Sequence, residues 1–342
     1  MTKYLLVDTA NTFFRARHVA FRGTDSWEKL GLAVHITLNA VLKCWQKQKA
    51  DHVVFCLEGR SWRKDFYEPY KKNRAVARQA LTEAEQEEDK LFWEAFDDLT
   101  KFLKEKTNCS VLRCEIAEAD DIIARWIHKH PNDEHCVVSS DTDFIQLLAP
   151  NVNQYNGITQ ELHTLDGIFN DKGERVIDKK TKEPKAIPDP EWLLFEKCMR
   201  GDTSDNVFSA YPGVRKKGTK NKVGLVEAFE DRKNKGFNWN NMMLQRWVDH
   251  NGVEHRVIDD YNRNVHLIDL TQQPKEIKEF VDTHIDETIA EKHNEMVGAK
   301  FLKFCGKYEL NKVAENAGKY AEFLHAGYTK WYTSIYNITT YY

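Results

Sequence analysis

The sequence lacks the patterns that mark several special classes of protein. Glycine and proline are few, 16 and 8 of 342 residues, which argues against a collagen-like or low-complexity chain. No apolar run approaches the roughly 18 residues that a membrane span needs. The apolar stretch in MTKYLLVDTA, at the N-terminus, is broken by Asp8 and is too short for a signal peptide. We therefore expect a folded, monomeric protein of the cytosol that does not enter a membrane.

Paired cysteines are also missing. The seven cysteines are odd in number, are scattered and include no C-x-x-C pair, which argues against a disulfide framework and against a zinc ribbon. They are Cys44, Cys56, Cys109, Cys114, Cys136, Cys198 and Cys305. We expect reduced thiols, most of them buried.

The chain as a whole has no excess of positive charge, because its net charge is -3. Cations are nevertheless concentrated in two segments. Residues 60–78 hold seven Lys or Arg against two acids, and residues 215–222, RKKGTKNK, hold five against none. Separate patches of opposite sign fit a polyanionic ligand that approaches an acidic metal centre.

The first 150 residues alternate between strand patterns and helix patterns. Short runs rich in β-branched residues predict strands, and apolar residues at helical spacing predict helices. The expected strands are 4–8, 52–58, 110–115 and 135–141, and the expected helices are roughly 29–49, 82–106 and 119–130. The helix at 82–106 begins with a T-x-x-E capping box formed by Thr82 and Glu85. This alternation predicts an α/β fold with a mostly parallel central sheet covered by helices on both faces.

The pattern changes beyond residue 150. A β-hairpin insertion is expected at about 155–188, a helix, turn and helix at 191–230 with YPGV as the tight turn, and further helices at 271–342. Single cores rarely grow far beyond about 250 to 300 residues. We therefore expect two parts, an α/β domain at 1–190 and a helical region at 191–342.

Carboxylates recur where the parallel strands are expected to end. Since such ends meet at one edge of a sheet, up to nine acids are predicted to converge there. They are Asp8, Glu58, Asp141 and Asp143 at strand ends, Glu118, Asp120 and Asp121 at the start of a helix, and Asp202 and Asp205 in RGDTSDN. Like charges so close need neutralisation. Because no His or Cys accompanies the set, its oxygen atoms favour Mg²⁺ or Mn²⁺ over zinc. Two such ions about 4 Å apart hydrolyse phosphodiesters.

Structural interpretations compete with the functional ones. A single Asp at a strand end often caps a helix or forms a turn, and Asp121 could pair with Arg125 at i,i+4. Phe66 could belong to the core, and RKKGTKNK could be a plain surface loop. The ordered set of acids on successive strand ends favours the metal site.

With these motifs in place, the chain resembles the flap endonuclease and 5′ nuclease superfamily, and most closely the phage RNase H type of 5′-3′ exonuclease. The resemblance spans about residues 4–230. Its motifs are LLVDTAN, WRKDFYEPYKKNR, EADD, SSDTDFIQL, RGDTSDN and PGV followed by VGLVEAF. It implies a PIN-like, or 5′-nuclease-like, fold with a helical arch at about 60–90 and a helix-hairpin-helix type DNA-binding element at about 191–230.

The resemblance also implies roles for residues. One ion is held by Asp8, Glu58, Glu118, Asp120 and Asp121, and the second by Asp141, Asp143, Asp202 and Asp205, in part through water. Lys71 and Arg74 contact the scissile phosphate, and Tyr70 stacks on a base. The DNA-binding set is Tyr70, Lys71, Lys72, Arg74, Gly213, Arg215, Lys216, Lys217, Lys220 and Lys222. The catalytic set is Lys71, Arg74, Asp8 and Asp141, and a K⁺ ion is implied at the helix-hairpin-helix type element.

Two features depart from the family pattern. Glu58 stands where the family usually has Asp, so the longer side chain reaches a metal through water or with altered geometry. The lysine-rich RKKGTKNK replaces a glycine-rich hairpin.

The expected function is that of a structure-specific 5′ nuclease with two Mg²⁺ ions, for which Mn²⁺ can substitute, acting on DNA with 5′ ends or flaps, and on RNA:DNA hybrids, in replication. A sliding clamp or a single-strand-binding protein is an expected partner, and the resemblance to phage enzymes points to the cytoplasm of a host. The alternatives are a PIN-type single-strand ribonuclease and a non-catalytic scaffold for branched DNA.

Overall fold

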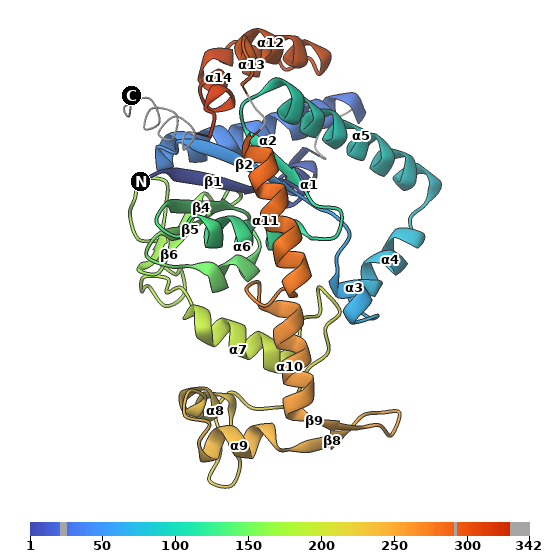
Figure 1. The fold of residues 1–342 in the computed structure, drawn as a ribbon, viewed down its shortest axis with the longest axis vertical. Coiled ribbons are helices and arrows are strands. Elements are labelled where there is room, and N and C mark those ends of the chain that lie inside the picture. Colours follow the sequence, from blue (N-terminus) through green and yellow to red (C-terminus); the bar gives the residue numbers. More distant parts are fainter. Residues whose placement is uncertain (21–25, 291–292, 329–342) are drawn as a thin grey trace, which may run out of the picture. The chain divides into compact units, whose positions relative to one another are not determined.

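A computed structural model describes residues 1–20, 26–290 and 293–328 (Figure 1). The chain forms two compact units. The first consists of Met1–Arg60, Leu81–Ile187 and the segment from Lys275 onward, and the second consists of Ser61–Ala80 and Pro188–Pro274. The backbone therefore passes from one unit to the other at 60/61, 80/81, 187/188 and 274/275.

A seven-stranded sheet is the centre of the first unit. Its strands are β1 (Lys3–Asp8), β2 (His52–Leu57), β3 (Ser110–Arg113), β4 (Glu134–Val138), β5 (Val152–Asn156), β6 (Glu161–Thr164) and β7 (Gly167–Phe169). They lie in the order β3-β2-β1-β4-β5-β6-β7. The first five are parallel, and β6 and β7 are antiparallel. The chain runs outward from β1 to β2 and β3 and then returns to β4, so the topological switch point lies between β1 and β4.

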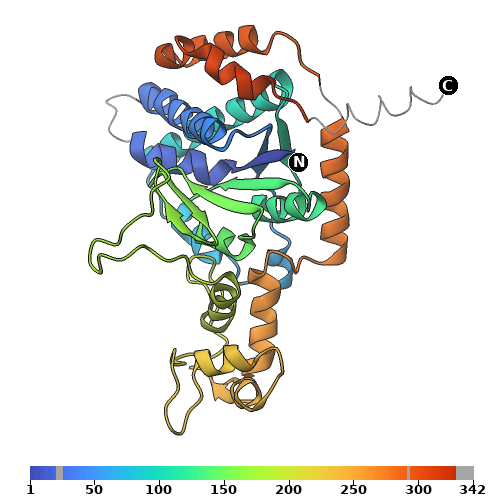
Figure 2. The ribbon, with the colours of Figure 1, turned by 90° about the vertical axis from the view of Figure 1, so that its left-hand side faces the viewer.

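Helices cover both faces of this sheet, as predicted. On one face lie α1 (Thr9–Ala20), α2 (Ser26–Gln48) and α5 (Glu83–Lys106), and on the other α6 (Ala119–Lys129) and α11 (Lys275–Ala290) (Figures 1 and 2). Alternate side chains of β1 serve the two faces: Leu5 and Val7 belong to the core under α2 and α5, whereas the ring of Tyr4 lies 5.3 Å from that of Trp126 in α6.

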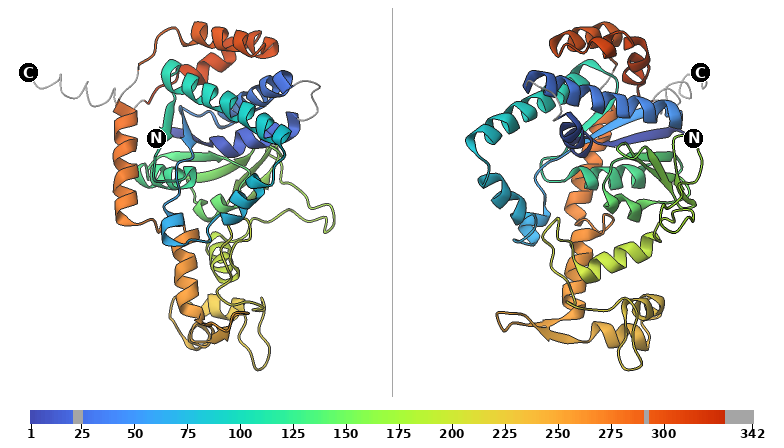
Figure 3. Two further views of the ribbon diagram at one scale, coloured as in Figure 1. Left: turned by 90° about the vertical axis from the view of Figure 1, so that its right-hand side faces the viewer. Right: turned by 180° about the vertical axis from the view of Figure 1, so that it is seen from behind.

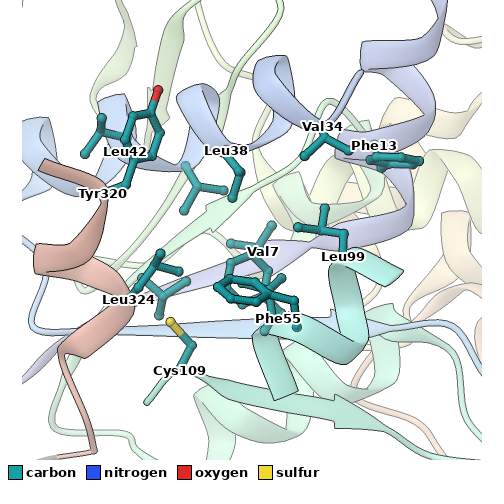
Figure 4. Close-up of a cluster of buried hydrophobic side chains, with 14 of the residues drawn as sticks. Val7, Phe13, Val34, Leu38, Leu42, Phe55, Leu99, Cys109, Tyr320 and Leu324 are labelled. Carbon is teal, nitrogen blue, oxygen red and sulfur yellow. The ribbon is translucent and has the colours of Figure 1, made fainter. Parts of the chain in front are cut away.

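The C-terminal helices complete the core under α2 and α5. They are α12 (Val297–Lys307), α13 (Asn311–Ala314) and α14 (Ala317–His325), and Figure 3 shows them beside α2 and α5. Phe304 stacks on Phe102 of α5 with ring centroids 4.5 Å apart. In Figure 4, Tyr320 and Leu324 point toward the same cluster as Val7 of β1. The last part of the described chain is therefore integral to the first unit.

The second unit is mainly helical. Its elements are α3 (Arg63–Phe66), α4 (Lys72–Gln79), α7 (Pro190–Arg200), α8 (Leu225–Asp231), α9 (Phe237–Met243), β8 (Arg246–Val248), β9 (Glu254–Arg256) and α10 (Val257–Ile268). Asn264 of α10 is fully buried, and its Nδ2 donates to the carbonyl oxygens of Cys198 and Phe208, both at 2.8 Å. This side chain ties α10 to α7 and to the segment that follows α7.

Most expected elements are present, and two features differ. The four predicted strands are β1 to β4, the capping box of Thr82 and Glu85 starts α5, and the YPGV turn closes with a hydrogen bond from Val214 N–H to the carbonyl oxygen of Tyr211. The helix α1 was not expected. The expected helical region at 191–342 is divided between the units, because α11 to α14 belong to the first unit, where α11 packs on α6 and β3, and α12 and α14 pack on α5 and α2. Periodicity shows that a helix has an apolar face but not which core that face joins.

All seven cysteines are free and buried, as expected of reduced thiols. Within residues 1–20, 26–290 and 293–328, each helix is too short or too polar to cross a bilayer.

Candidate active site

Asp8 lies at the centre of a group of acids at the carboxyl edge of the sheet. It is the last residue of β1, and it is 4% exposed. Its Oδ2 accepts a hydrogen bond from Ser139 Oγ (2.8 Å), and its Oδ1 accepts one from the N–H of Asn11 (3.2 Å). Burial raises the pKa of the Asp8 carboxyl well above its ordinary value, and the charges of Glu58 and Asp141 raise it further. The acids that follow β2 and β4 are thus close enough to repel the charge of Asp8.

The end of β2 meets the start of α6. Glu58 follows β2, and its Oε2 accepts a hydrogen bond from the N–H of Ala119, the first residue of α6 (3.3 Å). Gly59 permits this approach: its N–H donates to the carbonyl oxygen of Ala117 (3.0 Å), and a Cβ at position 59 would lie 1.7 Å from the carbonyl oxygen of Cys114. No larger residue fits there, so Gly59 helps to place Glu58 at the helix N-terminus.

Three further acids begin α6. Glu118 and Asp121 are buried, and Asp120 is partly exposed. Asp121 Oδ2 accepts a hydrogen bond from the N–H of Glu118 (3.2 Å), which caps the helix. The alternative that Asp121 pairs with Arg125 is wrong, because the guanidinium of Arg125 donates from two nitrogen atoms to the carboxylate of Asp282 in α11, at 2.8 and 2.6 Å.

Neutral groups hold the loop that follows β4. Ser139 Oγ, which donates to Asp8, accepts a hydrogen bond from the N–H of Asp141 (3.1 Å), and Asp141 Oδ1 accepts one from the N–H of Asp143 (3.0 Å). Gln154 lies in β5 and is 1% exposed. Its Nε2 donates to the carbonyl oxygens of Ser139 (3.0 Å) and Asp141 (2.5 Å). This amide fixes the backbone that carries both acids of the loop.

The pKa of Cys56, which lies beneath this edge, is affected by the same acids. Cys56 lies beside Asp8 in the register of β1 and β2. Burial raises the pKa of its thiol, and the charges of Asp8, Cys114, Asp120 and Glu58 raise it further. Among the residues that the structure describes, however, no three Asp, Glu, His or Cys side chains are already placed to share one ion. The edge thus concentrates carboxylates, but in the part of the chain that the structure describes they do not form a preassembled ligand set.

Asp202 and Asp205 belong to the second unit, where cations surround them. Asp202 Oδ2 accepts a hydrogen bond from Lys197 Nζ, and its Oδ1 accepts bonds from the N–H and Oγ of Ser204, all at 2.7 Å. Burial alone would raise the pKa of Asp202, but these bonds and the charge of Lys197 outweigh it and lower the pKa to about 2. The turn depends on Gly201 (φ +77°), where a Cβ would lie 2.3 Å from the carbonyl oxygen of Val207.

Asp205 contacts Tyr70, Lys71 and Arg74, the residues that are predicted to contact the substrate. Its Oδ2 accepts a hydrogen bond from the hydroxyl of Tyr70 (2.9 Å), its Oδ1 pairs with Arg74 (2.6 Å), and Lys71 Nζ lies 3.6 Å from Oδ2. Tyr70 is only 5% exposed, so the predicted stacking on a base would require its ring to be uncovered. Lys72 instead forms an exposed ion pair with Glu68.

The lysine-rich loop at 215–222 is ordered. Glu227 of α8 accepts hydrogen bonds from the N–H groups of Gly218 (3.0 Å) and Gly224 (2.9 Å). The N–H of Leu225 donates to the carbonyl oxygen of Arg215 (3.0 Å). The cations of the loop, all exposed, are Arg215, Lys216, Lys217, Lys220 and Lys222. Gly213 precedes them with φ +72° and open space around it. The loop presents its cations to solvent, while α7 and α8 flank it.

Sequence reasoning missed the neutral residues that support the acids. Asn11 Oδ1 accepts hydrogen bonds from the N–H (3.2 Å) and Oγ (2.9 Å) of Ser140. Asn11 and Ser139 lie inside the motifs LLVDTAN and SSDTDFIQL, so their position beside a strand-end acid was a usable signal. For Gln154 there was none, because its role depends on the register of β5 beside β4.

Comparison with known proteins identifies the family. The sequence profile described as "5'-3' exonuclease, N-terminal resolvase-like domain" matches residues 3–179, which is more than half of the chain. The chain is 27% identical over 233 residues to "Flap endonuclease Xni" of Shewanella loihica, covering 67% of this chain and 77% of that protein. It is 29% identical over 197 residues to "Ribonuclease H" of Enterobacteria phage T4, covering 53% and 55%.

Two further comparisons concern length and fold. The chain is 24% identical over 276 residues to "DNA polymerase I" of Rhizobium leguminosarum; the match covers 78% of this chain but spans only 22% of that protein. A solved structure of the bacteriophage T5 D15 flap endonuclease, in a complex with DNA and metal ions, superposes with a TM-score of 0.57 at 17% identity and covers 83% of this chain and 98% of that one. Profile, relatives and fold agree with the resemblance noted from the motifs: the chain belongs to the 5′-3′ exonuclease family of nucleases, whose members hydrolyse phosphodiester bonds.

Proposed function

We propose that this protein is a divalent-metal-dependent, structure-specific 5′ nuclease that removes primers or flaps with a 5′ end during DNA replication. The observation that carries the proposal is the group of acids around Asp8, in which Glu58, Asp120 and Asp141 act electrostatically on one strand edge. Bringing buried carboxylates together is costly in a folded protein, and the cluster lies at the topological switch point, where sites form in α/β sheets.

The donors fit hard divalent ions by their chemistry. They are oxygen atoms only, and burial together with the charges of Glu58 and Asp141 raises the pKa of Asp8, a shift that a bound divalent cation would oppose. One ion would be held by Asp8, Glu58, Glu118, Asp120 and Asp121, and the other by Asp141, Asp143, Asp202 and Asp205. The capping bond of Asp121 and the contact of Glu58 with α6 favour water-mediated roles for these two. When bound, Mg²⁺ or Mn²⁺ would activate a water and stabilise the leaving oxygen.

The remaining chemistry falls to residues of the arch. Lys71 and Arg74 would position the scissile phosphate, which carries negative charge like the carboxylate of Asp205 that they hold. A phosphate would therefore exchange with Asp205 for the same cations, and Asp205 would be released for a metal. Hydrolysis would leave a 5′ phosphate on the shortened strand.

Duplex binding is assigned to the second unit. The exposed cations at 215–222, together with Gly213 and the N-terminus of α8, would contact phosphates as a helix-hairpin-helix type element, with K⁺ as a candidate ion for its backbone. Glu227 accepts hydrogen bonds from the N–H groups of Gly218 and Gly224 and so orders the loop. This supports a rigid phosphate contact rather than a mobile surface loop.

The relatives guide the choice of substrate. One is named flap endonuclease and another ribonuclease H, so DNA with a 5′ end or flap and RNA:DNA hybrids are the proposed substrates. A sliding clamp or a single-strand-binding protein is the proposed kind of partner for what we propose is a monomer. The proposed location is the cytoplasm, that of the host if the chain is viral, and the seven free thiols support it.

A cleavage assay tests the proposal. A 5′-labelled flap and a nicked duplex are incubated with Mg²⁺, with Mn²⁺ and with EDTA, using the wild type, Asp141→Asn and the matched control Asp166→Asn, which changes an exposed acid in the turn between β6 and β7. We expect cleavage with either ion, none in EDTA, and a loss of at least about a hundredfold in Asp141→Asn only. Equal cleavage in all lanes would contradict the proposal.

The same assay separates the alternatives. Cleavage of single-stranded RNA in preference to every DNA substrate would favour a PIN-type ribonuclease. Binding to flaps without turnover in any metal would favour a non-catalytic scaffold.

A further inference from the structure

An ordered arm leaves the edge of the sheet after β7. Residues 170–187, here called the basic arm, extend the antiparallel part of the sheet: the N–H of Val176 donates to the carbonyl oxygen of Ile168 (2.9 Å), and the N–H of Lys185 donates back to the carbonyl oxygen of Val176 (2.8 Å). Figures 2 and 3 show the arm projecting from β6 and β7. Antiparallel bridges of Phe169 with Arg175 and of Ile177 with Pro184 hold the arm in a hairpin-like shape, so it is not an unstructured loop.

The tip of the basic arm is a closed turn. The N–H of Asp178 donates to the carbonyl oxygen of Glu183 (2.8 Å), and Asp178 Oδ1 accepts hydrogen bonds from the N–H groups of Lys180 (2.8 Å) and Thr181 (2.9 Å). The acid at the tip is therefore engaged by the backbone. These bonds hold the lysines of the tip on a defined turn.

The basic arm contributes nothing to the core, yet it carries cations. None of the residues 170–187 is buried. The arm holds six Lys or Arg against four acids. Lys185 pairs with Glu161 (3.4 Å), and Arg175 lies over the ring of Phe169 (5.7 Å), so these two cations secure the base of the arm. The others, Lys172, Lys179, Lys180 and Lys182, are exposed and form no ion pair with any residue that the structure describes.

We infer that the basic arm is a duplex-DNA contact that grips the phosphate backbone outside the catalytic edge. The inference deepens the proposed function and rests on it. The arm has no fully buried residue, so burial contributes little to its ordering, and its cations are the main feature that it presents to solvent. Lysines act as point charges, and the tip has neither arginine forks nor aromatic rings. The contact would therefore add affinity and salt dependence but no sequence preference.

Binding in EDTA tests the inference without catalysis. The affinity of a labelled duplex with a 5′ flap is measured by fluorescence anisotropy over a series of salt concentrations. The arm variant carries Lys179→Gln, Lys180→Gln and Lys182→Gln. The control carries Lys303→Gln, Lys312→Gln and Lys319→Gln, which remove the same charge from exposed positions on α12, α13 and α14.

The two variants should differ in a defined way. Removing one lysine–phosphate pairing lowers the magnitude of the slope of log affinity against log salt by about 0.9. We expect the slope of the arm variant to fall by one to about three such steps, with at least roughly tenfold weaker binding at low salt, while the control stays within twofold of the wild type. The thermal midpoint of the arm variant should match that of the wild type, because none of its three lysines is buried.

The outcomes distinguish the arm from the proposed function. If the wild type cleaves flaps but the arm variant keeps the slope of the control, the arm inference is overturned and the proposed function stands. If the wild type cleaves no DNA in any metal, the proposed function fails, and the binding series still decides whether the arm contacts duplex. The same series is run with a plain duplex without a flap. If the arm variant lowers the slope for the flap substrate but not for the plain duplex, the arm is not a duplex contact.

Discussion

Replacing Gln154 by methionine tests whether the acids of the loop after β4 depend on a neutral support. Methionine has nearly the same volume as glutamine, so no cavity is created. The change removes an amide that donates to the carbonyl oxygens of Ser139 and Asp141 (3.0 and 2.5 Å). It leaves these two acceptors, one of them on a buried residue, without that donor.

The magnitude follows from these hydrogen bonds. The loss of each one costs about 1 kcal/mol, and a stranded buried acceptor costs about 1 to 3 kcal/mol. Gln154 Oε1 is itself buried without a partner among the described residues. Replacing it with methionine removes that unfavourable burial and offsets part of the loss of stability. We expect a net loss of about 1 to 3 kcal/mol in the free energy of unfolding. Support of this kind for metal-ligating groups is typically worth about 10- to 100-fold in metal affinity.

Three measurements check this expectation. Urea unfolding gives the stability, titration calorimetry with Mn²⁺ gives the affinity, and hydrogen exchange reports on the N–H groups of Asp141 and Asp143, which should exchange faster. Asn153→Ala is the matched control, because its side chain points to the opposite face of β5. A folded Gln154→Met protein with the Mn²⁺ affinity and the exchange rates of the wild type would refute the reasoning.

Three other perturbations have defined outcomes. Gly59→Ala should cost about 2 to 4 kcal/mol of stability in urea unfolding, since its Cβ would lie 1.7 Å from the carbonyl oxygen of Cys114; wild-type stability would contradict the geometry. Asp202 has a pKa lowered to about 2, so in EDTA it should contribute about 2 kcal/mol that is present above about pH 4 and is lost as the pH falls toward 2. Asp202→Asn should remove that part of the pH dependence, and an unchanged profile would count against it. A double-mutant cycle of Arg125→Met and Asp282→Asn should give a coupling of about 1 to 3 kcal/mol between α6 and α11, and a value near zero would show that the pair is only a surface contact.

The strand ends were predictable because local pattern and topology agree there. Runs such as HVVFCL are buried along their whole length, as strands of a parallel sheet are, and the acids at their ends follow from chain direction. The helix α1 was missed because TANTFFRARHVA follows β1 without a turn and mixes polar with apolar residues. Its position is set by packing against α2.

Within the site, charge was easier to predict than support. Acids and lysines are recognisable as candidate site residues from their charge alone. Gln154 matters only because the register of β5 places it beside Val137 of β4. Asp205 shows the opposite limit. Its carboxylate predicted a metal ligand, but the structure places Tyr70, Lys71 and Arg74 around it. This arrangement brings together segments more than a hundred residues apart in the sequence, so the sequence alone could not show it.

The four passages of the backbone between the units have a practical consequence for dissecting the protein. The match to the family profile ends at residue 179, which suggests cutting the chain there to isolate a minimal nuclease. Such a fragment would lose α12 and α14, and with them Phe301, Phe323 and Leu324, leaving the apolar sides of α2 and α5 open to water. Its poor solubility would say nothing about catalysis. A fragment meant to keep the core of the first unit therefore has to retain the helices from Val297 to His325.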